Sequence, residues 1–303
     1  MSTFNLNDIP SQKGRIAIVT GANIGLGYET ALGLVQKEMK VILACRNLSK
    51  AEKAKADILQ EVPGADLAII QLDLSKLSSV REFAATFLAQ YNRLDLLINN
   101  AGIMMPPFSL TEDGFESQIG TNYLGHFLLT GLLLDTITQT ADSRVVTLSS
   151  LAHVNGEIQF DDFHFEQNYS AMKAYGQSKL ACLMFAIELD RRLKKAGLST
   201  ISVSAHPGIS QTNLMSSSPR WMQIIGAILG PFMLQSAKAG AEPTLYAALG
   251  ADIEGKDYTG PDGKGQRKGK ATKVYPKSHA LDEEVATKMW ELSEKLTGMS
   301  YLS

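Results

Sequence analysis

The stretch 15–27 reads Arg15-Ile16-Ala17-Ile18-Val19-Thr20-Gly21-Ala22-Asn23-Ile24-Gly25-Leu26-Gly27. It begins with a strand-like run up to Thr20, and a helical stretch over about 25–38 follows the glycines. Glycines between a strand and a helix let the backbone approach a pyrophosphate, while the helix N-terminal amides face its negative charge. The stretch therefore predicts a dinucleotide-binding turn, with cofactor contacts from Gly21, Asn23, Ile24, Gly25, Leu26 and Gly27.

The next apolar run, 41–45, ends in Arg46. An NAD-selective site usually carries Asp or Glu at this place for the ribose 2′-hydroxyl, whereas a guanidinium suits a 2′-phosphate. The alternative is that Arg46 is only a solvent-facing charge at the end of a strand. The residue type favours NADP(H) over NAD(H) as the cofactor.

A tyrosine and a lysine stand four residues apart in Tyr175-Gly176-Gln177-Ser178-Lys179. On a helix, positions i and i+4 lie on one face, so the phenol and the ammonium can share one site. The positive charge favours the phenolate, which makes Tyr175 usable as an acid or base near neutral pH. An isolated pair of this kind would more simply be an exposed tyrosine beside a solvated lysine, but here the glycine turn accompanies it.

Strand-like and helix-like segments alternate along the chain, which is typical of a parallel sheet covered on both faces. Strands are predicted near 15–20, 40–45, 67–72, 95–98, 144–149 and 200–205, and helices near 25–38, 49–61, 77–91, 114–135, 172–196, 237–249 and 282–297. No Pro/Gly/Ser-rich linker interrupts the pattern. We predict an α/β Rossmann fold with a doubly wound parallel sheet of about seven strands. It forms one domain over 14–303 after an N-terminal extension at 1–13.

The composition is that of a globular, enzyme-sized chain, with 303 residues, 45% hydrophobic residues and a formal net charge of −2. This charge gives no electrostatic reason to bind nucleic acid. Residues 1–13 are polar and no apolar run reaches about 18 residues, so we expect no signal peptide, no transmembrane segment and a cytoplasmic location. Cys45 and Cys182 are expected to be buried free thiols, and the five histidines lack metal-ligand spacing, so no metal site is expected.

Further motifs follow the predicted strands in order. They are Thr20-Gly21-x-x-x-Gly25-x-Gly27, Asp73-Leu74, Asn99-Asn100-Ala101-Gly102, Asn122, Ser149-Ser150, Tyr175-x-x-x-Lys179 and Pro207-Gly208. Together, over about residues 14 to 250, they resemble the short-chain dehydrogenase/reductase family. The runs 44–47, 122–127 and 174–181 are most similar to its retinol-dehydrogenase-like group, which includes relatives of light-dependent protochlorophyllide reductase and the oxidoreductase domain of WW-domain-containing oxidoreductase.

The resemblance implies a catalytic set of Asn122, Ser150, Tyr175 and Lys179. Tyr175 would exchange a proton with the substrate oxygen while hydride moves to or from the nicotinamide, and Lys179 would hydrogen-bond the nicotinamide ribose. Ser150, chosen over Ser149, would hold the substrate oxygen, and Asn122 would hold a water in a proton relay. The family pattern also implies cofactor contacts from Asp73, Leu74, Asn99, Ala101, Gly102, Pro207, Gly208 and Thr212.

Several of these residues have a purely structural alternative. Ser150 could cap a helix, and Asn122 could be a buried amide bonded to backbone. Asn99 could shape a turn at the carboxyl edge of the sheet as well as meet the cofactor. Asp73 could cap a helix instead of lying near the adenine amino group.

Three further segments carry no motif of their own. Ser150 and Tyr175 are 25 positions apart (175 − 150), a longer spacing than is typical of the family. The additional residues 155–165 are expected to form either part of the substrate mouth or a surface hairpin. Segment 209–239 is predicted to be a substrate lid, and its apolar run 222–234 favours an apolar substrate. Instead of a lid, the segment could form an interfacial membrane contact, or a helix in the core or at a subunit interface. The basic run 255–277 is predicted to be a solvated loop.

Two functions from different classes fit this sequence. The first is an NADP(H)-dependent oxidoreductase that interconverts a carbonyl and a primary or secondary alcohol on a fairly apolar small molecule. The second is an NADP-binding interaction or sensor module with little turnover, but such a module has no need of the complete catalytic set. A serine hydrolase is excluded, because Leu180 stands where a Gly-x-Ser-x-Gly elbow requires glycine. The sequence leaves open the substrate, the direction of reaction and a homo-oligomeric state.

Overall fold

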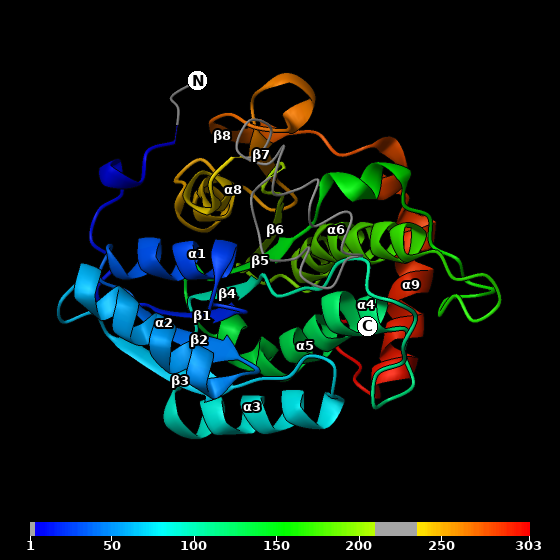
Figure 1. Cartoon of the computed structure of the whole chain (residues 1–303), viewed down its shortest axis with the longest axis horizontal. Helices are drawn as coiled ribbons and strands as arrows, with labels where there is room; N and C mark the ends of the chain where they lie inside the picture. Colours follow the sequence, from blue (N-terminus) through cyan, green and yellow to red (C-terminus); the bar gives the residue numbers. More distant parts are fainter. Residues whose placement is uncertain (1–3, 210–234) are drawn as a thin grey trace.

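The computed structural model describes residues 4–209 and 235–303. In this part of the chain, eight strands form one sheet in the order β3-β2-β1-β4-β5-β6-β7-β8 (Figure 1). They are β1 (Ile16–Thr20), β2 (Lys40–Cys45), β3 (Leu67–Gln71), β4 (Leu96–Asn99), β5 (Arg144–Leu148), β6 (Ile201–Ala205), β7 (Tyr258–Pro261) and β8 (Ala271–Val274). All pairs are parallel except β7 with β8. The predicted doubly wound Rossmann fold is confirmed, with eight strands in place of about seven.

Helices cover both faces of the sheet (Figure 1). One face carries α1 (Gly25–Val35), α2 (Leu48–Glu61) and α8 (Ala237–Leu249). The other carries α3 (Leu77–Gln90), α5 (Gly125–Thr138), α6 (Ala171–Lys195) and α9 (Glu283–Thr297). The described residues also form short helical turns: η1 (Leu6–Asp8), α4 (Ser117–Ile119), the π-helical η2 (Gly120–Leu124), η3 (Leu151–Asn155), η5 (Lys264–Gln266) and η6 (Ser278–Leu281).

The strand order fixes where a ligand can enter. β1 and β4 are neighbours, although β2 and β3 lie between them in the sequence, so the chain reverses its direction of winding there. In an open parallel sheet, this reversal leaves a crevice at the carboxyl ends of the strands. β4 is completely buried, as expected of a central strand covered by helices on both sides. The motifs after β1, β4, β5 and β6 therefore meet at one edge.

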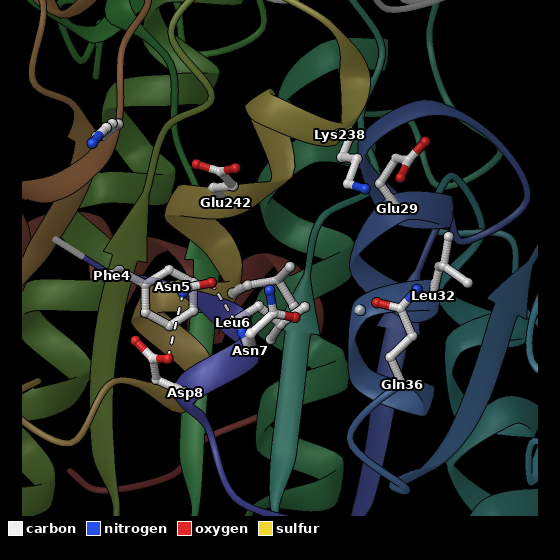
Figure 2. Close-up of a pocket in the computed structure, with 13 residues that line it drawn as sticks. Phe4, Asn5, Leu6, Asn7, Asp8, Glu29, Leu32, Gln36, Lys238 and Glu242 are labelled. Carbon is white, nitrogen blue, oxygen red and sulfur yellow. Dashed lines mark hydrogen bonds between the residues drawn. The ribbon is translucent and has the colours of Figure 1, made fainter.

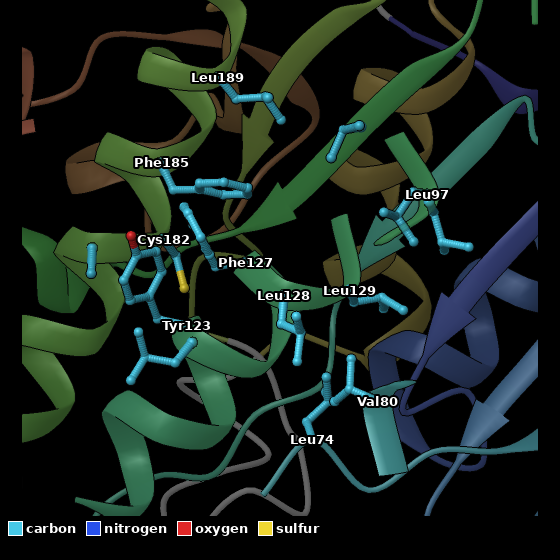
Figure 3. Packing of buried hydrophobic residues seen from close by; sticks show 14 of the residues in the cluster. Leu74, Val80, Leu97, Tyr123, Phe127, Leu128, Leu129, Cys182, Phe185 and Leu189 are labelled. Atoms are coloured by element: carbon cyan, nitrogen blue, oxygen red, sulfur yellow. The ribbon is translucent and has the colours of Figure 1, made fainter. Parts of the chain in front are cut away.

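Aromatic side chains lock α9 onto α5 and α6. The ring of Trp290 on α9 lies 5.0 Å from Phe127 on α5 and 5.8 Å from Phe185 on α6, measured between centroids. Phe127 and Phe185 lie side by side in the core, as Figure 3 shows. Each of these side chains is completely or almost completely buried, and burying one stabilises the fold by about 1.5–3 kcal/mol.

The segment 255–277 was predicted to be a solvated loop, and that prediction was wrong. It contains β7 and β8, which form an antiparallel hairpin that extends the sheet beyond β6. Tyr258 pairs with Ser204 and is 2% exposed. Each strand has only four residues, and β7 includes Gly260 and Pro261, so the usual strand pattern is too short to detect. The lysines that suggested a loop lie mostly at the tip and the exposed face of this hairpin.

Residues 4–9 pack against the face that carries α1 and α8. Phe4 lies 5.2 Å from the Tyr246 ring, and Leu6 and Ile9 also contact that core. A groove of about 590 Å³ lies between this segment and the two helices, with Glu29, Lys238 and Glu242 on its wall (Figure 2). None of the residues predicted to contact the cofactor lines this groove, although Lys238, from the described end of the predicted lid, does. Among the described helices, none is long and apolar enough to cross a membrane.

Candidate active site

The turn between β1 and α1 has the shape expected of a phosphate cradle. Gly21 has a φ of +67°, and a Cβ there would lie 3.1 Å from Ala101. A Cβ at Gly27 would lie 2.4 Å from the carbonyl oxygen of Gly21, so only glycine lets α1 begin this close to the turn. Ile24 precedes α1 and gives it no side-chain cap. The first amides of an 11-residue helix are therefore left for a ligand.

Arg46 lies at the carboxyl end of β2, next to this turn. The backbone N–H of Gly21 donates to the carbonyl of Ala44 at 2.8 Å, two residues before Arg46. The Arg46 side chain is exposed and forms no ion pair within the described residues. Its guanidinium is thus free to meet an anion beside the glycine turn.

The residues after β3 are held by their own local bonds. One Asp73 carboxylate oxygen, Oδ1, accepts from the Ser75 backbone N–H at 3.0 Å and from the Ser75 hydroxyl at 2.6 Å. Oδ1 therefore closes a local turn. The helix-cap alternative for Asp73 is wrong, because the N-cap residue of α3 is Lys76 and Asp73 Oδ1 bonds Ser75 instead. Leu74 is buried, and its carbonyl would lie 2.5 Å from a Cβ at Gly125. Its side chain belongs to the core, so a cofactor contact would have to come from its backbone.

The turn after β4 is clamped onto the glycine turn. Asn100 donates from Nδ2 to the Thr20 carbonyl at 2.7 Å, and the Asn100 and Ala101 backbone N–H groups both donate to Thr20 Oγ1 at 2.9 Å. Asn99 is buried and donates from Nδ2 to Thr130 Oγ1 at 3.2 Å, while its Oδ1 has no partner among the described residues. Sequence reasoning gave Thr20 no role of its own, although a threonine directly before the first glycine is the signal for this clamp.

Asn122 lies in the π-helical turn η2, where Gly125 N–H bonds back five residues to Gly120. Turns of this kind occur frequently at functional sites. Asn122 Oδ1 accepts from the Ile103 backbone N–H at 2.8 Å, and Nδ2 donates to the Ile103 carbonyl at 3.0 Å and to Ser178 Oγ at 2.9 Å. Both amide protons are used, and only an Oδ1 lone pair is left for a water.

Tyr175 and Lys179 lie on α6 and are each 6% exposed. The Lys179 ammonium lies 6.0 Å from the centre of the Tyr175 ring and donates to the Leu148 carbonyl at 3.2 Å. No carboxylate pairs with it in residues 4–209 or 235–303. A Cβ at Gly102 would lie 3.1 Å from Asn122 Oδ1 and 3.5 Å from the Lys179 ammonium, so the turn after β4 borders both groups.

Ser149 and Ser150 follow β5 and have different environments. Ser149 is buried and donates its hydroxyl to the Lys179 carbonyl at 2.8 Å. Ser150 is partly exposed, and its Oγ accepts from the Ala152 backbone N–H at 3.2 Å, which caps η3. The Ser150 hydroxyl proton therefore stays available, whereas that of Ser149 is committed to α6.

The inserted residues 155–165 contain no strand, so the surface-hairpin alternative is wrong. Gln177, two residues after Tyr175, holds this segment: its Oε1 accepts from the Gln159 N–H at 2.8 Å and its Nε2 donates to the Phe163 carbonyl at 2.9 Å. Phe163 and Phe165 are buried. The segment is thus fixed to the helix that carries the tyrosine.

The end of β6 meets the β7–β8 hairpin. The backbone N–H of Ile209 donates to the Arg267 carbonyl at 2.7 Å, one residue after Pro207-Gly208. Burial lowers the pKa of His206 to about 4. Thr212 and the central part of the predicted lid, 210–234, lie outside the described residues.

Both cysteines are free and buried, as predicted. Burial raises the pKa of the Cys45 thiol to about 11. Neither thiol is therefore prepared to act as a thiolate nucleophile near neutral pH.

Comparison with known proteins tests the family resemblance. The sequence model of the short chain dehydrogenase family matches residues 15–223, more than half of the chain. The chain belongs to this family. Human retinol dehydrogenase 13 is 43% identical over 294 residues, covering 94% of this chain and 85% of the relative. A Brassica napus relative, the chloroplastic short-chain dehydrogenase TIC 32 A, is 42% identical over 288 residues, covering 92% and 88%.

Solved structures agree with this assignment. A crystal structure of a Mycobacterium paratuberculosis protein is 41% identical and superimposes with a TM-score of 0.82, covering 99% of each chain. Pseudomonas aeruginosa RhlG in its NADP active-site complex is 23% identical, with a TM-score of 0.64 over 82% of this chain and 94% of its own, and shares the fold. The resemblance to the retinol-dehydrogenase-like short-chain dehydrogenases is confirmed, and the chain is an oxidoreductase of that family.

A nicotinamide cofactor fits the residues of this short-chain dehydrogenase. The uncapped start of α1 and the close approach at Gly21 and Gly27 leave room and amide donors for a pyrophosphate. The Arg46 guanidinium and the Lys179 ammonium, neither of which pairs with a carboxylate of the described residues, add positive charge along the same edge. Family membership supports a nicotinamide cofactor, and these features explain how the chain would hold its anionic part.

Proposed function

We propose that this protein is an NADP(H)-dependent oxidoreductase that interconverts a carbonyl and a primary or secondary alcohol, with Tyr175 as the general acid and base. The observation that carries the proposal is the convergence of Tyr175, Lys179, Asn122 and Gly102 beside the glycine turn. The three segments that hold them, which are the first turns of α6, the turn η2 and the loop after β4, lie at the carboxyl edge of the sheet, where this fold binds its ligands.

Each catalytic group would have a distinct task. The Tyr175 hydroxyl would pass a proton to or from the substrate oxygen, with the Lys179 ammonium beside it. The Ser150 hydroxyl proton would hold the substrate oxygen. A bound nicotinamide would supply or accept the hydride. The remaining Asn122 lone pair would hold one water, and Asn122 would also fix the 103–122 connection.

The choice of NADP(H) rests on Arg46. Its free guanidinium can form charge-assisted hydrogen bonds with a 2′-phosphate, and Asp73 would lie toward the adenine. The position of Arg46 at the end of β2, beside the bond between Gly21 and Ala44, supports this assignment.

An apolar substrate is supported by side chains near Tyr175. Met172, one helical turn before it, is 56% exposed, and Phe108 is 43% exposed and lies 5.2 Å from the Tyr169 ring, measured between centroids. Large apolar side chains that remain exposed near a catalytic group gain free energy when an apolar ligand covers them. A bulky carbonyl or alcohol compound suits this surface better than a sugar.

The test is a turnover screen of aldehydes, ketones, retinoids and steroids with NADPH and NADH, run on the wild type and on Tyr175→Phe. Removing the transferable proton should lower kcat by at least about a thousandfold and leave the NADPH dissociation constant within about threefold. Tyr301→Phe, which removes a buried hydroxyl bonded to the Phe127 carbonyl, serves as the control for general destabilisation. Turnover that survives in Tyr175→Phe would exclude the assigned role.

A further inference from the structure

A buried histidine connects the cofactor turn to the catalytic helices. His126 lies on α5 and is 2% exposed. Its Nε2 lies 2.9 Å from Thr20 Oγ1, and its Nδ1 lies 2.9 Å from the Asn122 carbonyl oxygen. One ring therefore contacts the residue before the first glycine and the π-helical turn that borders Lys179.

The direction of every proton in this chain of bonds follows from its partners. The Asn122 carbonyl can only accept, so Nδ1 must carry the ring proton and Nε2 must be the acceptor. Thr20 Oγ1 already accepts from the backbone N–H groups of Asn100 and Ala101. Its one hydroxyl proton can reach His126 Nε2 at 2.9 Å or the Ile98 carbonyl at 3.3 Å, and the histidine is the closer acceptor. Burial lowers the pKa of His126 to about 4, and the nearby Lys179 ammonium acts in the same direction. The imidazole is neutral and has a single tautomer.

Both ends of the chain continue into the site. At one end, the Asn100 side chain holds the Thr20 carbonyl, which precedes Gly21. At the other end, the Asn122 carbonyl also accepts from the Cys182 thiol at 3.2 Å, and the Asn122 side chain bonds Ser178, next to Lys179. Figure 3 shows Cys182 beside Tyr123, the neighbour of Asn122. A shift of the glycine turn is thus transmitted to α6 through this chain of hydrogen bonds.

We propose that His126, as the neutral Nδ1–H tautomer, is a positioning residue that sets the cofactor turn and the acid–base helix at a fixed separation. The proposal rests on the proposed function, because it assigns His126 to the same site. The Nε2 half of the ring orients the cofactor turn through Thr20. The Nδ1 half orients the catalytic groups through Asn122.

Two substitutions separate these halves. In His126→Asn, the side-chain Nδ2 can replace Nδ1 and donate to Asn122, but nothing reaches Thr20. In His126→Gln, Oε1 can replace Nε2 and accept from Thr20, but the donor to Asn122 is lost. We expect His126→Asn to weaken NADPH binding about 5- to 10-fold with kcat within twofold at saturation, and His126→Gln to lower kcat about 5- to 10-fold with the dissociation constant within twofold. Each value corresponds to one buried hydrogen bond.

The matched control is Thr140→Val. Thr140 lies just beyond the other end of α5, where its hydroxyl accepts from the Leu94 N–H at 3.2 Å. Loss of this buried bond should lower Tm without changing the dissociation constant or kcat. If both His126 variants behave like Thr140→Val, or if both lose affinity and turnover together, His126 has no divided positioning role.

A measurement on the wild type does not depend on how the variants fold. Long-range ¹⁵N–¹H spectra of histidine-labelled protein should show His126 protonated at Nδ1 from pH 8 to pH 5. A ring protonated at Nε2, or one that titrates near pH 6.5, overturns the proposal. If the wild type binds neither NADPH nor NADH, the proposed function itself fails, whereas a wild type that binds and turns over beside unaltered variants rejects only the role of His126.

Discussion

The buried charged side chains at the two ends of the central strands differ in their partners. At the amino ends, Asp95 is completely buried and pairs with Arg93 at 2.7 Å and Arg15 at 3.1 Å, and it also accepts from the Ile16 N–H. Burial raises the pKa of Asp95, but these hydrogen bonds outweigh burial and the net pKa lies below its ordinary value. At the carboxyl ends, the buried Lys179 has only a carbonyl partner in the described residues, and the groups around it are neutral.

The charges at the amino ends of these strands therefore stabilise the fold, whereas the charge at the carboxyl ends serves the proposed chemistry. A buried carboxylate with two guanidinium partners resists change, and breaking such a set is expensive in free energy. A buried ammonium without a carboxylate is a less stable arrangement, but it leaves a positive charge for an anionic ligand or a phenolate. Substitutions at the two ends should therefore affect different measurements.

The largest effect is expected for Lys179→Met. Turnover should fall at least a thousandfold, about 4 kcal/mol of transition-state stabilisation, because the phenolate and the cofactor lose their positive partner. The free energy of unfolding should stay the same or rise, since a buried unpaired charge is removed. Denaturant unfolding and steady-state kinetics measure both. Lys195→Met, at an exposed position of the same helix, is the control, and a less stable Lys179→Met protein would contradict the comparison.

Asp95→Asn should have the opposite signature. The free energy of unfolding should fall by about 3 kcal/mol, because two guanidinium groups lose their buried partner. The values of kcat and KM should stay within twofold. Asp66→Asn, which breaks an exposed pair with Lys40, should cost less than about 1 kcal/mol. Equal losses of unfolding free energy in the two variants would mean that the buried ion pairs of Asp95 stabilise the fold no more than an exposed pair does.

The histidines at the carboxyl edge should make stability depend on pH. The pKa of His206 lies near 4 in the folded protein and near 6.5 when unfolded, so the unfolded state binds more protons between these values and stability falls as pH falls from 7 to 5. The expected contribution is about 2 kcal/mol. The free energy of unfolding should be measured at pH 7 and pH 5. The difference between the two values should be smaller in His206→Asn than in the wild type by about this amount. A variant with the wild-type pH dependence would mean that the fold does not lower the pKa of His206.

The smallest effect concerns cofactor choice. Arg46→Asp should reduce the preference for NADPH over NADH by about tenfold, or roughly 1.4 kcal/mol, because the 2′-phosphate loses its guanidinium partner. Dissociation constants of both dinucleotides measure this ratio. Lys50→Asp makes the same charge change at an exposed position of α2 and should leave the ratio unaltered. A ratio that changes equally in both variants would indicate a general charge effect instead of a contact.

The sequence predicted the first six strands to within about one residue, because each is an apolar run bounded by a turn or a helix. β7 and β8 were missed, because four-residue strands with Gly260 and Pro261 carry no such run. They form a strand pair where they do because β7 pairs with the outer edge of β6, a tertiary contact that the local sequence does not encode. Local propensity is a weak guide in that situation.

The candidate site was predictable to the level of its motifs but not of its bonds. The structure brings Asn122, Tyr175 and Lys179 together. Ser150 caps η3, and the preceding Ser149 is bonded to the Lys179 carbonyl. The link through Thr20 and His126 joins residues 106 positions apart, so no spacing within one helix or strand could reveal it. The π-helical turn at Asn122 was also hidden, because one extra residue in a helical turn leaves no mark on the hydrophobic pattern.

The hairpin of β7 and β8 has a consequence for synthesis of the chain on the ribosome. β6 is complete at Ala205, but the strand that covers its outer edge begins only at Tyr258. A nascent chain released between these points presents an open strand edge, which can pair with other chains. The carbonyl of Arg267, which receives the Ile209 amide, is also still missing at that stage. Chains truncated in this interval should aggregate instead of accumulating as partly active protein.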